Sequence, residues 1–417
     1  MKYSFIILPL LILGMDIQAQ IVKKTGSLFQ EISNHISTMP GDSGLDYREP
    51  TNRELKTWEH TIQNLLATHY QAAGDSAQKV GYELLEFSDT TSGQNKLYYL
   101  LQTQDSNHWG AYIYNPHYCR PLVIQSPHAK KDANTGLQGA YIFMETGAMF
   151  FEVNGTHRCN SSSPSTCSGS TTVCSSNSSS RPYPISDLSH TTQSLFQKTT
   201  EVIFQEIDKS FFIQLHGFAK KSSDPYVILS NGTQQTPSTD YLDDFRINLF
   251  MIDPSLTFKV AHIDTTWTRL RGFLNTQGRY INSSSDPCQS NATQTSGRFF
   301  HIEQERSKLR DNEAGWTKIA EALKRSFHCQ SLSQLERGSI NRLHVYPNPA
   351  EDYVQIVGLN GRSFDPSAFI FSAMGQNVSK EVIIHDSRGL MKLDISALSP
   401  GVYWIKLEHE SFKILKR

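Results

Sequence analysis

The segment from Pro121 to Gly136 reads PLVIQSPHAKKDANTG and joins a strand pattern to polar residues that suit a site. Its apolar run LVI is typical of a buried strand, and the run stops at Ser126 and the proline that follows. His128 and Asp132 come within six residues of Ser126. A strand followed by His and Asp is either the edge of a metal site or a polar loop, and this segment alone leaves both interpretations open.

Similar apolar runs recur between residues 121 and about 327, with helical patterns between them. The runs are PLVIQ (121–125), AYIFM (140–144), AMFFEVN (148–154), FFIQLH (211–216), YVILSN (226–231) and RFFHIE (298–303). The helical patterns are TTQSLFQKTTEVIFQEI (191–207) and KIAEALKRSF (318–327). Strand-like runs that alternate with helices predict an α/β domain, with a mostly parallel sheet and helices on both faces.

The whole chain has 417 residues, which favours two or three domains and allows a substantial core. Its 39 basic and 40 acidic side chains give a formal net charge of −1. Because nucleic-acid binding needs a basic surface, DNA and RNA are not expected partners.

The first residues, MKYSFIILPLLILGMDIQAQ, have the pattern of a secretory signal peptide covering residues 1–19. The apolar stretch from Phe5 to Leu13 is too short to span a bilayer, and a cleavage point follows Ala19. No other segment has the roughly 20 apolar residues that a membrane helix needs. We therefore expect an exported mature protein without a transmembrane segment.

Six cysteines fit an exported protein, and none forms a CxxC pair. We therefore expect structural disulfides and no zinc ribbon, with the pairing left open. Two Ser/Thr-rich stretches, 160–180 and 281–297, are expected to be surface loops, because they offer little to bury.

Residues 20–120 form an N-terminal region whose expected use is to support the domain of residues 121–330. RELKTWEHTIQNLLATHY (53–70) carries one apolar helical stripe, and LYYLLQT and WGAYIYN look like strands.

The C-terminal residues, 344–417, alternate apolar and polar positions over short runs and predict a small antiparallel β-sandwich. The motifs YPNPA (346–350), MGQ (374–376) and GVY (401–403), followed by a basic end, resemble the C-terminal sorting domain of type IX secretion cargo. This resemblance implies passage through the periplasm and outer membrane by the type IX machinery. It implies a location at the cell surface or in the medium, and removal of the sorting domain after export.

Four of the apolar runs end in polar groups that could meet at one edge of the sheet, since ligands gather at the carboxyl ends of parallel strands. The groups are His128 and Asp132, NGTHR (Asn154 to Arg158), His216-Gly217, and Glu303. Two His and one carboxylate suit a catalytic zinc ion, and a further Glu suits a general base. Alternation puts His301 and Glu303 on one face of their strand, although a salt bridge with Arg306 or Arg310 would also explain Glu303.

The order of these motifs resembles the zinc carboxypeptidase superfamily and, more closely, N-formylglutamate amidohydrolases. The resemblance implies one zinc ion held by His128, Asp132 and His216. It implies Glu303 as the catalytic base, Arg158 as a partner of a substrate carboxylate or oxyanion, and Asn154 as a substrate-binding residue. Arg279, in RGFLNTQGRYIN (271–282), could bind an anionic substrate group, but a turn with solvated arginines explains that segment equally well.

The chain departs from the family pattern at the acidic ligand. Carboxypeptidases space the pair as HxxE, whereas His128 and Asp132 are one residue further apart and the acid is shorter. Asp187 and His190, in ISDLSH, could replace Asp132 as ligand or line the pocket, unless Ser186 or Asp187 only caps a helix.

Taken together, the sequence predicts an exported zinc-dependent hydrolase of amide bonds, either a peptidase or an N-acyl amino acid amidohydrolase. The alternative is a surface adhesin or binding protein on the same fold. A two-metal phosphoesterase has less support, and no GxSxG, HExxH or phosphate-loop motif indicates another catalytic scheme.

Overall fold

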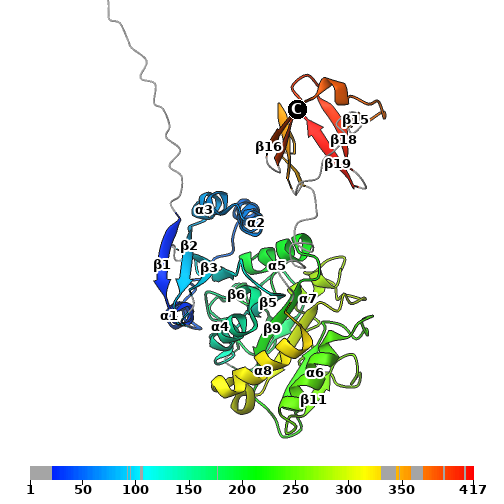
Figure 1. Cartoon of the computed structure of the whole chain (residues 1–417). Coiled ribbons are helices and arrows are strands. Elements are labelled where there is room, and N and C mark those ends of the chain that lie inside the picture. Colours follow the sequence, from blue (N-terminus) through cyan, green and yellow to red (C-terminus); the bar gives the residue numbers. More distant parts are fainter. Residues whose placement is uncertain are drawn as a thin grey trace, which may run out of the picture. The chain divides into compact units, whose positions relative to one another are not determined.

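The computed structural model describes residues 21–329, except 92, 94, 104–106 and 176, and residues 344–417, except 347, 358–369, 388–389 and 408–409. The expected signal peptide, residues 1–19, lies outside the described residues. The described chain forms two compact units (Figure 1). The larger comprises most of the chain up to His328, and the smaller includes Cys329–Arg417.

The larger unit is built on one mixed sheet of ten described strands. In chain order they are β1 (Val22–Gly26), β2 (Tyr82–Asp89), β3 (Lys96–Thr103), β4 (Ala111–Tyr114), β5 (Arg120–Ser126), β6 (Ala148–Val153), β9 (Phe211–Gly217), β10 (Val227–Ser230), β11 (Phe258–Val260) and β12 (Phe299–Gln304). Their order across the sheet is β1-β2-β3-β4-β6-β5-β9-β12-β10-β11.

The centre of the sheet is parallel. Strands β6, β5, β9 and β12 run in the same direction, and β4 and β10 join them antiparallel on either side. The register pairs Gln125 with Gln214, and it pairs His216 with Glu303. The carboxyl ends of β5, β9 and β12 therefore meet at one edge of the sheet.

Helices cover both faces of this sheet (Figure 1), as expected for the α/β class. They are α1 (Leu28–Thr38), α2 (Asn52–Leu66), α3 (Tyr70–Gln78), α4 (Thr135–Thr146), α5 (Leu195–Glu206), α6 (Tyr241–Ile252), α7 (Thr276–Ile281) and α8 (Glu313–Ser326), with a short π-helix at Arg306–Arg310. Helices α1, α4, α6 and α8 share one apolar core with alternate residues of the strands, among them Ile124, Leu215 and Ile302. The opposite face, toward α2, α5 and α7, carries Gln125 and Gln214.

The expectation of a strand at AYIFM is wrong, because this run lies inside α4. Helix α4 ends at Gly147, whose φ of 58° is the left-handed conformation typical of a residue that terminates a helix. Ala140, Ile142 and Phe143 are all buried. A helix packed against both a sheet and other helices is apolar around most of its surface, so a short apolar run cannot distinguish it from a strand.

Residues of the N-terminal region contribute β1 to β4 to the same sheet. Helix α2 begins with a capping box, in which Thr51 and Glu54 satisfy each other's backbone N–H groups. Its buried Trp58 packs against Tyr82 and Tyr112 and donates from Nε1 to Thr199 Oγ1 at 2.8 Å. This region is thus continuous with the sheet that bears the polar strand ends.

The two Ser/Thr-rich loops are tied together by a disulfide. Cys167 pairs with Cys288, and Cys159 pairs with Cys174. Cys119 and Cys329 are disulfide-bonded as well, which confirms the expectation of structural disulfides. The first loop also contains the short strands β7 (Ser170–Thr171) and β8 (Arg181–Pro182), which pair antiparallel.

Replacing both Cys167 and Cys288 by Ala is expected to lower the free energy of unfolding of the larger unit by about 2–5 kcal/mol. The bridge closes a loop with a sequence separation of 121, against 15 for Cys159–Cys174, and a longer loop loses more entropy when it is crosslinked. Urea unfolding of both double variants measures the difference. An equal or larger loss for the Cys159–Cys174 pair would contradict this account.

The smaller unit consists of two antiparallel sheets. One contains β13 (His344–Tyr346), β14 (Tyr353–Val357), β17 (Leu390–Asp394) and β16 (Ile383–Ser387), and the other contains β15 (Ile370–Ser372), β18 (Gly401–Leu407) and β19 (Glu410–Lys416). A 3-10 turn lies at Ser379–Glu381. Val354, Leu393, Ile405 and Ile414 belong to its core. These sheets agree with the expected β-sandwich.

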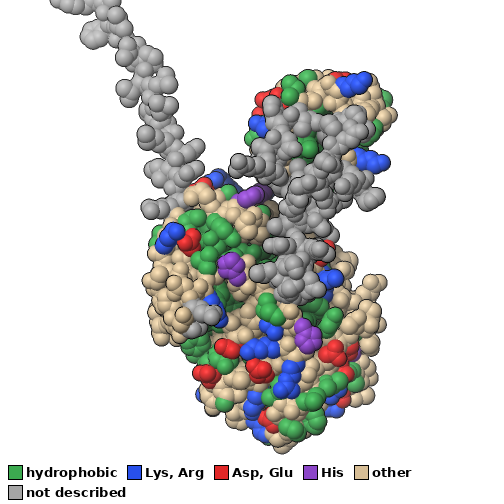
Figure 2. Space-filling view, viewed as in Figure 1, with side chains coloured by type: hydrophobic (Ala, Val, Ile, Leu, Met, Phe, Trp, Pro, Cys, Tyr) green, Lys and Arg blue, Asp and Glu red, His purple; other side chains and the backbone are tan. Residues whose placement is uncertain are grey.

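Charged side chains of both signs are mixed on the face of the molecule that Figure 2 shows, in line with the net charge of −1. Among the described helices, none combines the length and the apolar character that a membrane crossing requires.

Candidate metal centre

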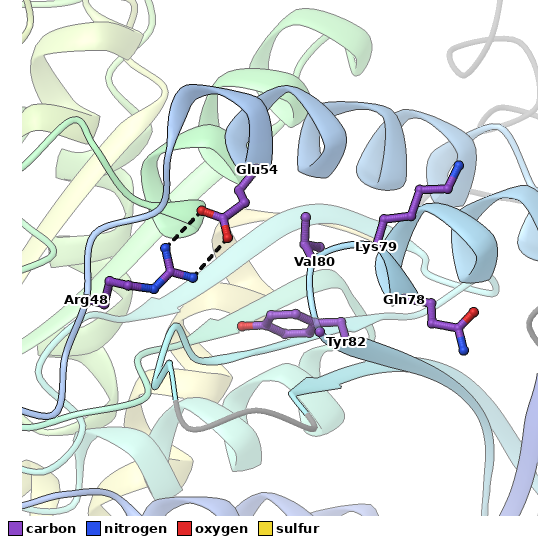
Figure 3. Close-up of a pocket in the computed structure, with 7 residues that line it drawn as sticks. Arg48, Glu54, Gln78, Lys79, Val80 and Tyr82 are labelled. Carbon is purple, nitrogen blue, oxygen red and sulfur yellow. Dashed lines mark hydrogen bonds and ion pairs between the residues drawn. The ribbon is translucent and has the colours of Figure 1, made fainter.

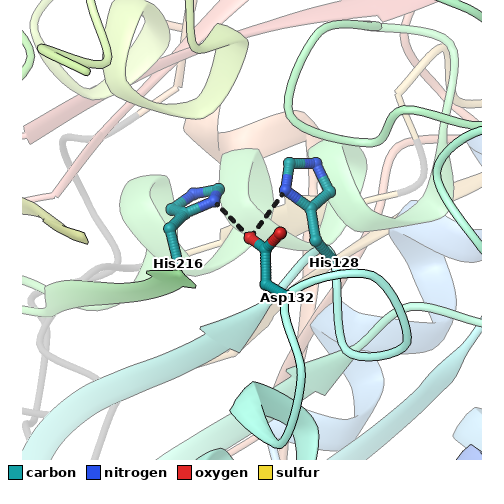
Figure 4. Close-up of side chains that lie close together, drawn as sticks. All are labelled: His128, Asp132 and His216. Atoms are coloured by element: carbon teal, nitrogen blue, oxygen red, sulfur yellow. Dashed lines mark hydrogen bonds and ion pairs between the residues drawn. The ribbon is translucent and has the colours of Figure 1, made fainter. Parts of the chain in front are cut away.

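His128, Asp132 and His216 lie together at the carboxyl edge of the parallel strands. His128 and Asp132 belong to the turn after β5, and His216 is the penultimate residue of β9. Asp132 Oδ2 lies 3.3 Å from His128 Nδ1 and 3.4 Å from His216 Nδ1 (Figure 4). All three side chains are at least nine-tenths buried.

The far nitrogen of His128 is held by a carboxylate. Its Nε2 lies 2.8 Å from Asp187 Oδ1, and Arg158 donates to Asp187 Oδ2 through Nε at 3.0 Å and through a second guanidinium nitrogen. Burial raises the pKa of Asp187, but Arg158, His190 and His128 outweigh it and hold that pKa well below its ordinary value. An ionised Asp187 only accepts hydrogen bonds, so His128 Nε2 must carry a proton.

The far nitrogen of His216 is held by an amide. Its Nε2 lies 2.8 Å from Gln214 Oε1. Burial is the largest cause of a lowered pKa of His216, which falls to about 4, so the ring is neutral near pH 7. With Nε2 as the donor, Nδ1 presents a lone pair toward Asp132.

This arrangement fits a divalent metal ion. His216 Nδ1 and Asp132 Oδ2 are two acceptors facing each other at 3.4 Å in a buried place, which is unfavourable unless a cation lies between them. Burial and Arg158 lower the pKa of His128, but Asp187 and Asp132 outweigh them and raise it, so a proton on His128 Nδ1 can fill part of this role. Two imidazoles and one carboxylate, each fixed by an outer partner, are the donor set of a catalytic zinc site.

Glu303 lies beside this cluster without a hydrogen-bond partner for one of its oxygens. It is paired with His216 in the register of β12 and β9, and among the described groups none bonds its buried Oε2. Burial first and the Asp132 charge second raise the pKa of Glu303 to about 8. No described ion pair joins it to Arg306 or Arg310: Arg306 pairs with Asp311 at 2.8 Å.

Arg310 instead braces the loop that carries Asp132. From the π-helix Arg306–Arg310, it donates from Nε to Gln304 O at 3.1 Å and from a terminal nitrogen to Ala133 O at 2.6 Å. The guanidinium lies against Gly217, where an added Cβ would come within 2.2 Å of it. The N–H of Gly217 in turn donates to Asp132 Oδ2 at 3.2 Å. These contacts hold the loop of Asp132 in place beside His216.

Asn154 and Arg279, the residues with expected substrate roles, are engaged within the fold. Asn154 Oδ1 accepts from the N–H of Ala129 at 3.1 Å and so supports the turn after His128. Arg279 is 2% exposed and donates to Ser168 Oγ, Asn291 Oδ1 and Cys288 O, so it fastens the Ser/Thr-rich loops and is not joined to His128.

Asp187 and His190 lie on the Nε2 side of His128, whereas Asp132 lies on its Nδ1 side. His190 Nδ1 is 3.0 Å from Asp187 Oδ1, and its ring stacks on Tyr183 at 3.6 Å. They stand in a turn before α5, with no described helix beginning at Asp187. Arg158 completes this group, and its NH1 lies 3.3 Å from His128 Nδ1.

Three neighbours of the cluster were not assigned roles from the sequence. His301 stacks on His216 at 4.4 Å, with Nε2 4.0 Å from Glu303 Oε1. Gln214 contacts His216, and Arg310 donates to the backbone of the loop that carries Asp132. Alternation along FFIQLH places Gln214 on the face of His216, and this signal could have found it. The contact of Arg310 with the loop of Asp132 is visible only in three dimensions.

A separate cavity of about 410 Å³ lies in the N-terminal region (Figure 3). It is lined by Arg48, Glu54, Gln78, Lys79, Val80, Gly81 and Tyr82. Two nitrogens of Arg48 donate to the two oxygens of Glu54 at 2.9 Å each, so this charge is already paired. None of the clustered histidines lines this cavity.

Comparison with solved structures finds weak similarities to hydrolases. An N-formylglutamate amidohydrolase from Ralstonia eutropha JMP134 is 12% identical, covers 51% of this chain and 92% of its own, and has a TM-score of 0.33. A bacteriophage poly-gamma-glutamate hydrolase is 14% identical, over 50% of this chain and 84% of its own, with a TM-score of 0.28. A putative carboxypeptidase from Burkholderia mallei ATCC 23344 is 12% identical, over 63% of this chain and 65% of its own, with a TM-score of 0.29. At such TM-scores these similarities carry no argument about function.

The sequence comparisons assign the C-terminal part. No curated protein matches the chain. A family model described as "Secretion system C-terminal sorting domain" matches residues 344–417. Those residues are therefore a type IX sorting domain, and the chain is a cargo of that system, exported across the outer membrane to the cell surface or the medium.

Proposed function

We propose that the larger unit is a zinc-dependent hydrolase of amide bonds, of the peptidase or N-acyl amino acid amidohydrolase type. The observation that carries this proposal is the buried contact of His216 Nδ1 with Asp132 Oδ2 at 3.4 Å, with His128 Nδ1 beside it. In this proposal His128, Asp132 and His216 hold one zinc ion. Asp187 and His190 are not zinc ligands in this proposal, because the guanidinium of Arg158 already pairs with the carboxylate of Asp187.

A bound zinc ion would supply Lewis-acid polarisation of an amide carbonyl and lower the pKa of a water molecule. In its ionised form Glu303 would take a proton from the attacking water and pass it to the leaving amine, because it lies beside the cluster, its Oε2 has no bonding partner among the described groups, and its raised pKa makes the carboxylate a stronger base. Burial keeps this proton transfer away from bulk solvent. Arg158 NH1, next to His128, stabilises the negative charge that develops on the carbonyl oxygen.

Removal of metal is expected to abolish hydrolysis of N-acyl amino acids and dipeptides, and added zinc is expected to restore it. Elemental analysis of the full exported chain should find one zinc per chain before chelation and none after it. Undiminished hydrolysis in metal-free protein would exclude a metal-dependent mechanism. A chain that holds no zinc and hydrolyses no amide would favour the alternative of an adhesin or binding protein.

A further inference from the structure

A network of buried amides lies on the α5 and α7 face of the sheet and ends at His216. Its members are Gln125 on β5, Gln214 on β9, Gln277 on α7 and Asn275, which caps α7, and each is at most 1% exposed. Buried amides are costly unless their groups are hydrogen-bonded, so the direction of each amide is constrained by its partners. Oxygen and nitrogen of a Gln side chain are assigned from such partners.

Backbone groups fix the direction of Gln277 and of Asn275. Gln277 Nε2 lies 2.9 Å from Leu188 O, which can only accept, so Gln277 Oε1 is the atom that faces Gln214 at 3.2 Å. Asn275 Oδ1 accepts from the N–H of Gly278 at 2.9 Å, so Asn275 Nδ2 is the atom that faces Gln214.

A third anchor acts through Gln125. Thr200 Oγ1 donates to Phe196 O at 3.1 Å, so it must accept from Gln125 Nε2 at 2.8 Å. Gln125 Oε1 then faces Gln214 at 3.0 Å. Gln214 therefore meets acceptors on the side of Gln125 and Gln277, and a donor on the side of Asn275.

All three anchors assign the same orientation to Gln214. Its Nε2 donates to Gln125 and Gln277, and its Oε1 accepts from Asn275 and faces His216 Nε2 at 2.8 Å. An amide oxygen cannot donate, so the proton of the neutral His216 ring must be on Nε2.

We propose that Gln214 is a positioning residue that holds His216 in the Nε2–H tautomer, so that Nδ1 offers its lone pair to Asp132 and to a metal ion. The part concerning metal affinity rests on the proposed function, whereas the tautomer does not. A network that only filled the core would set no preference between the two nitrogens. The anchors at Leu188, Phe196 and Gly278 make the preference a property of the fold.

The direct test is the tautomer of His216 in the metal-free full chain, read from ring ¹⁵N resonances near pH 7 and assigned with His216→Asn. Protonation at Nε2 is expected. Protonation at Nδ1 in the wild-type protein would overturn the proposal without any variant, even if zinc binds. Conversely, the Nε2–H form in a chain that never binds zinc would leave the tautomer assignment standing and refute the proposed function.

Three variants test the role of Gln214. Gln214→Leu removes the acceptor and is expected to mix the tautomers and to weaken zinc binding by about 10–100-fold, measured against a chromophoric chelator. Gln214→Glu keeps an acceptor for His216 and is expected to keep the Nε2–H form, with a loss of stability because its second oxygen cannot donate to Gln125 and Gln277. Gln125→Leu is the matched control, because it removes an equally buried amide of the same network and leaves Gln214 Oε1 in place.

The outcomes separate positioning from packing. Loss of the tautomer preference in Gln214→Leu but not in Gln125→Leu supports the proposal. Equal effects in both variants, or unchanged tautomer and zinc affinity in a folded Gln214→Leu, would contradict it.

Discussion

Glu303→Gln is expected to lower kcat for amide hydrolysis by about 10²–10⁴-fold, the usual contribution of a positioned general base. Glutamine keeps the size of the side chain but cannot accept a proton from water. The proposed zinc ligands are His128, Asp132 and His216. Because Glu303 is not one of them, the variant is expected to retain one zinc per chain. The measurement is kcat on a panel of N-acyl amino acids and dipeptides, together with elemental analysis.

Glu305→Gln is the matched control for that experiment. Glu305 is two residues further along and accepts from the N–H of Ser307 through one carboxylate oxygen and from the N–H of Lys308 through the other, and Gln keeps one of these two acceptors. Its replacement should leave kcat unchanged. Full activity of Glu303→Gln would remove Glu303 as the base, and loss of zinc from that variant would make it a ligand.

His216→Ala is expected to weaken zinc binding by more than about 100-fold, since outer partners of a ligand alone are worth about 10–100-fold. The substitution leaves Gln214 Oε1 with Asn275 as its donor, so the loss is expected to affect the metal more than the fold. Competition with a chelator gives the affinity, and urea unfolding checks that the larger unit is intact.

His190→Ala distinguishes the two possible ligand sets. His190 contacts Asp187 at 3.0 Å but lies on the far side of His128. If Asp132 is the acidic ligand, this variant should keep zinc affinity within a few-fold. A loss as large as that of His216→Ala would instead place the metal between His128, Asp187 and His190.

The fold class could be predicted from the sequence because its signal is local. FFIQLH and RFFHIE are short, mostly apolar runs that end in polar residues, and both are strands of the parallel centre. AYIFM failed because a helix buried on most sides has no visible period. Residues 271–282 contain α7, whose Arg279 is buried by contacts with loops distant in sequence.

The candidate site was harder to predict from the sequence, because the residues that contact the proposed ligands come from separate elements. His128 and His216 could be named from their positions after β5 and at the end of β9, and the structure brings them together around Asp132. The engagement of Arg158 with Asp187 and the brace from Arg310 to Ala133 depend on how loops fold over the strand ends. No spacing rule in one sequence reports such contacts.

The Cys167–Cys288 bridge has a consequence for when this chain can mature. Arg279 donates to the carbonyl of Cys288, and Arg279 is on α7, whose cap Asn275 donates to Gln214. The disulfide therefore helps to hold α7 in place. The cap of α7, Asn275, orients the amide of Gln214, which in turn faces His216. Because thiols stay reduced in the cytosol, a chain that has not been exported lacks this fastening. We therefore expect the proposed metal site to become fully ordered only after export, once this disulfide has formed.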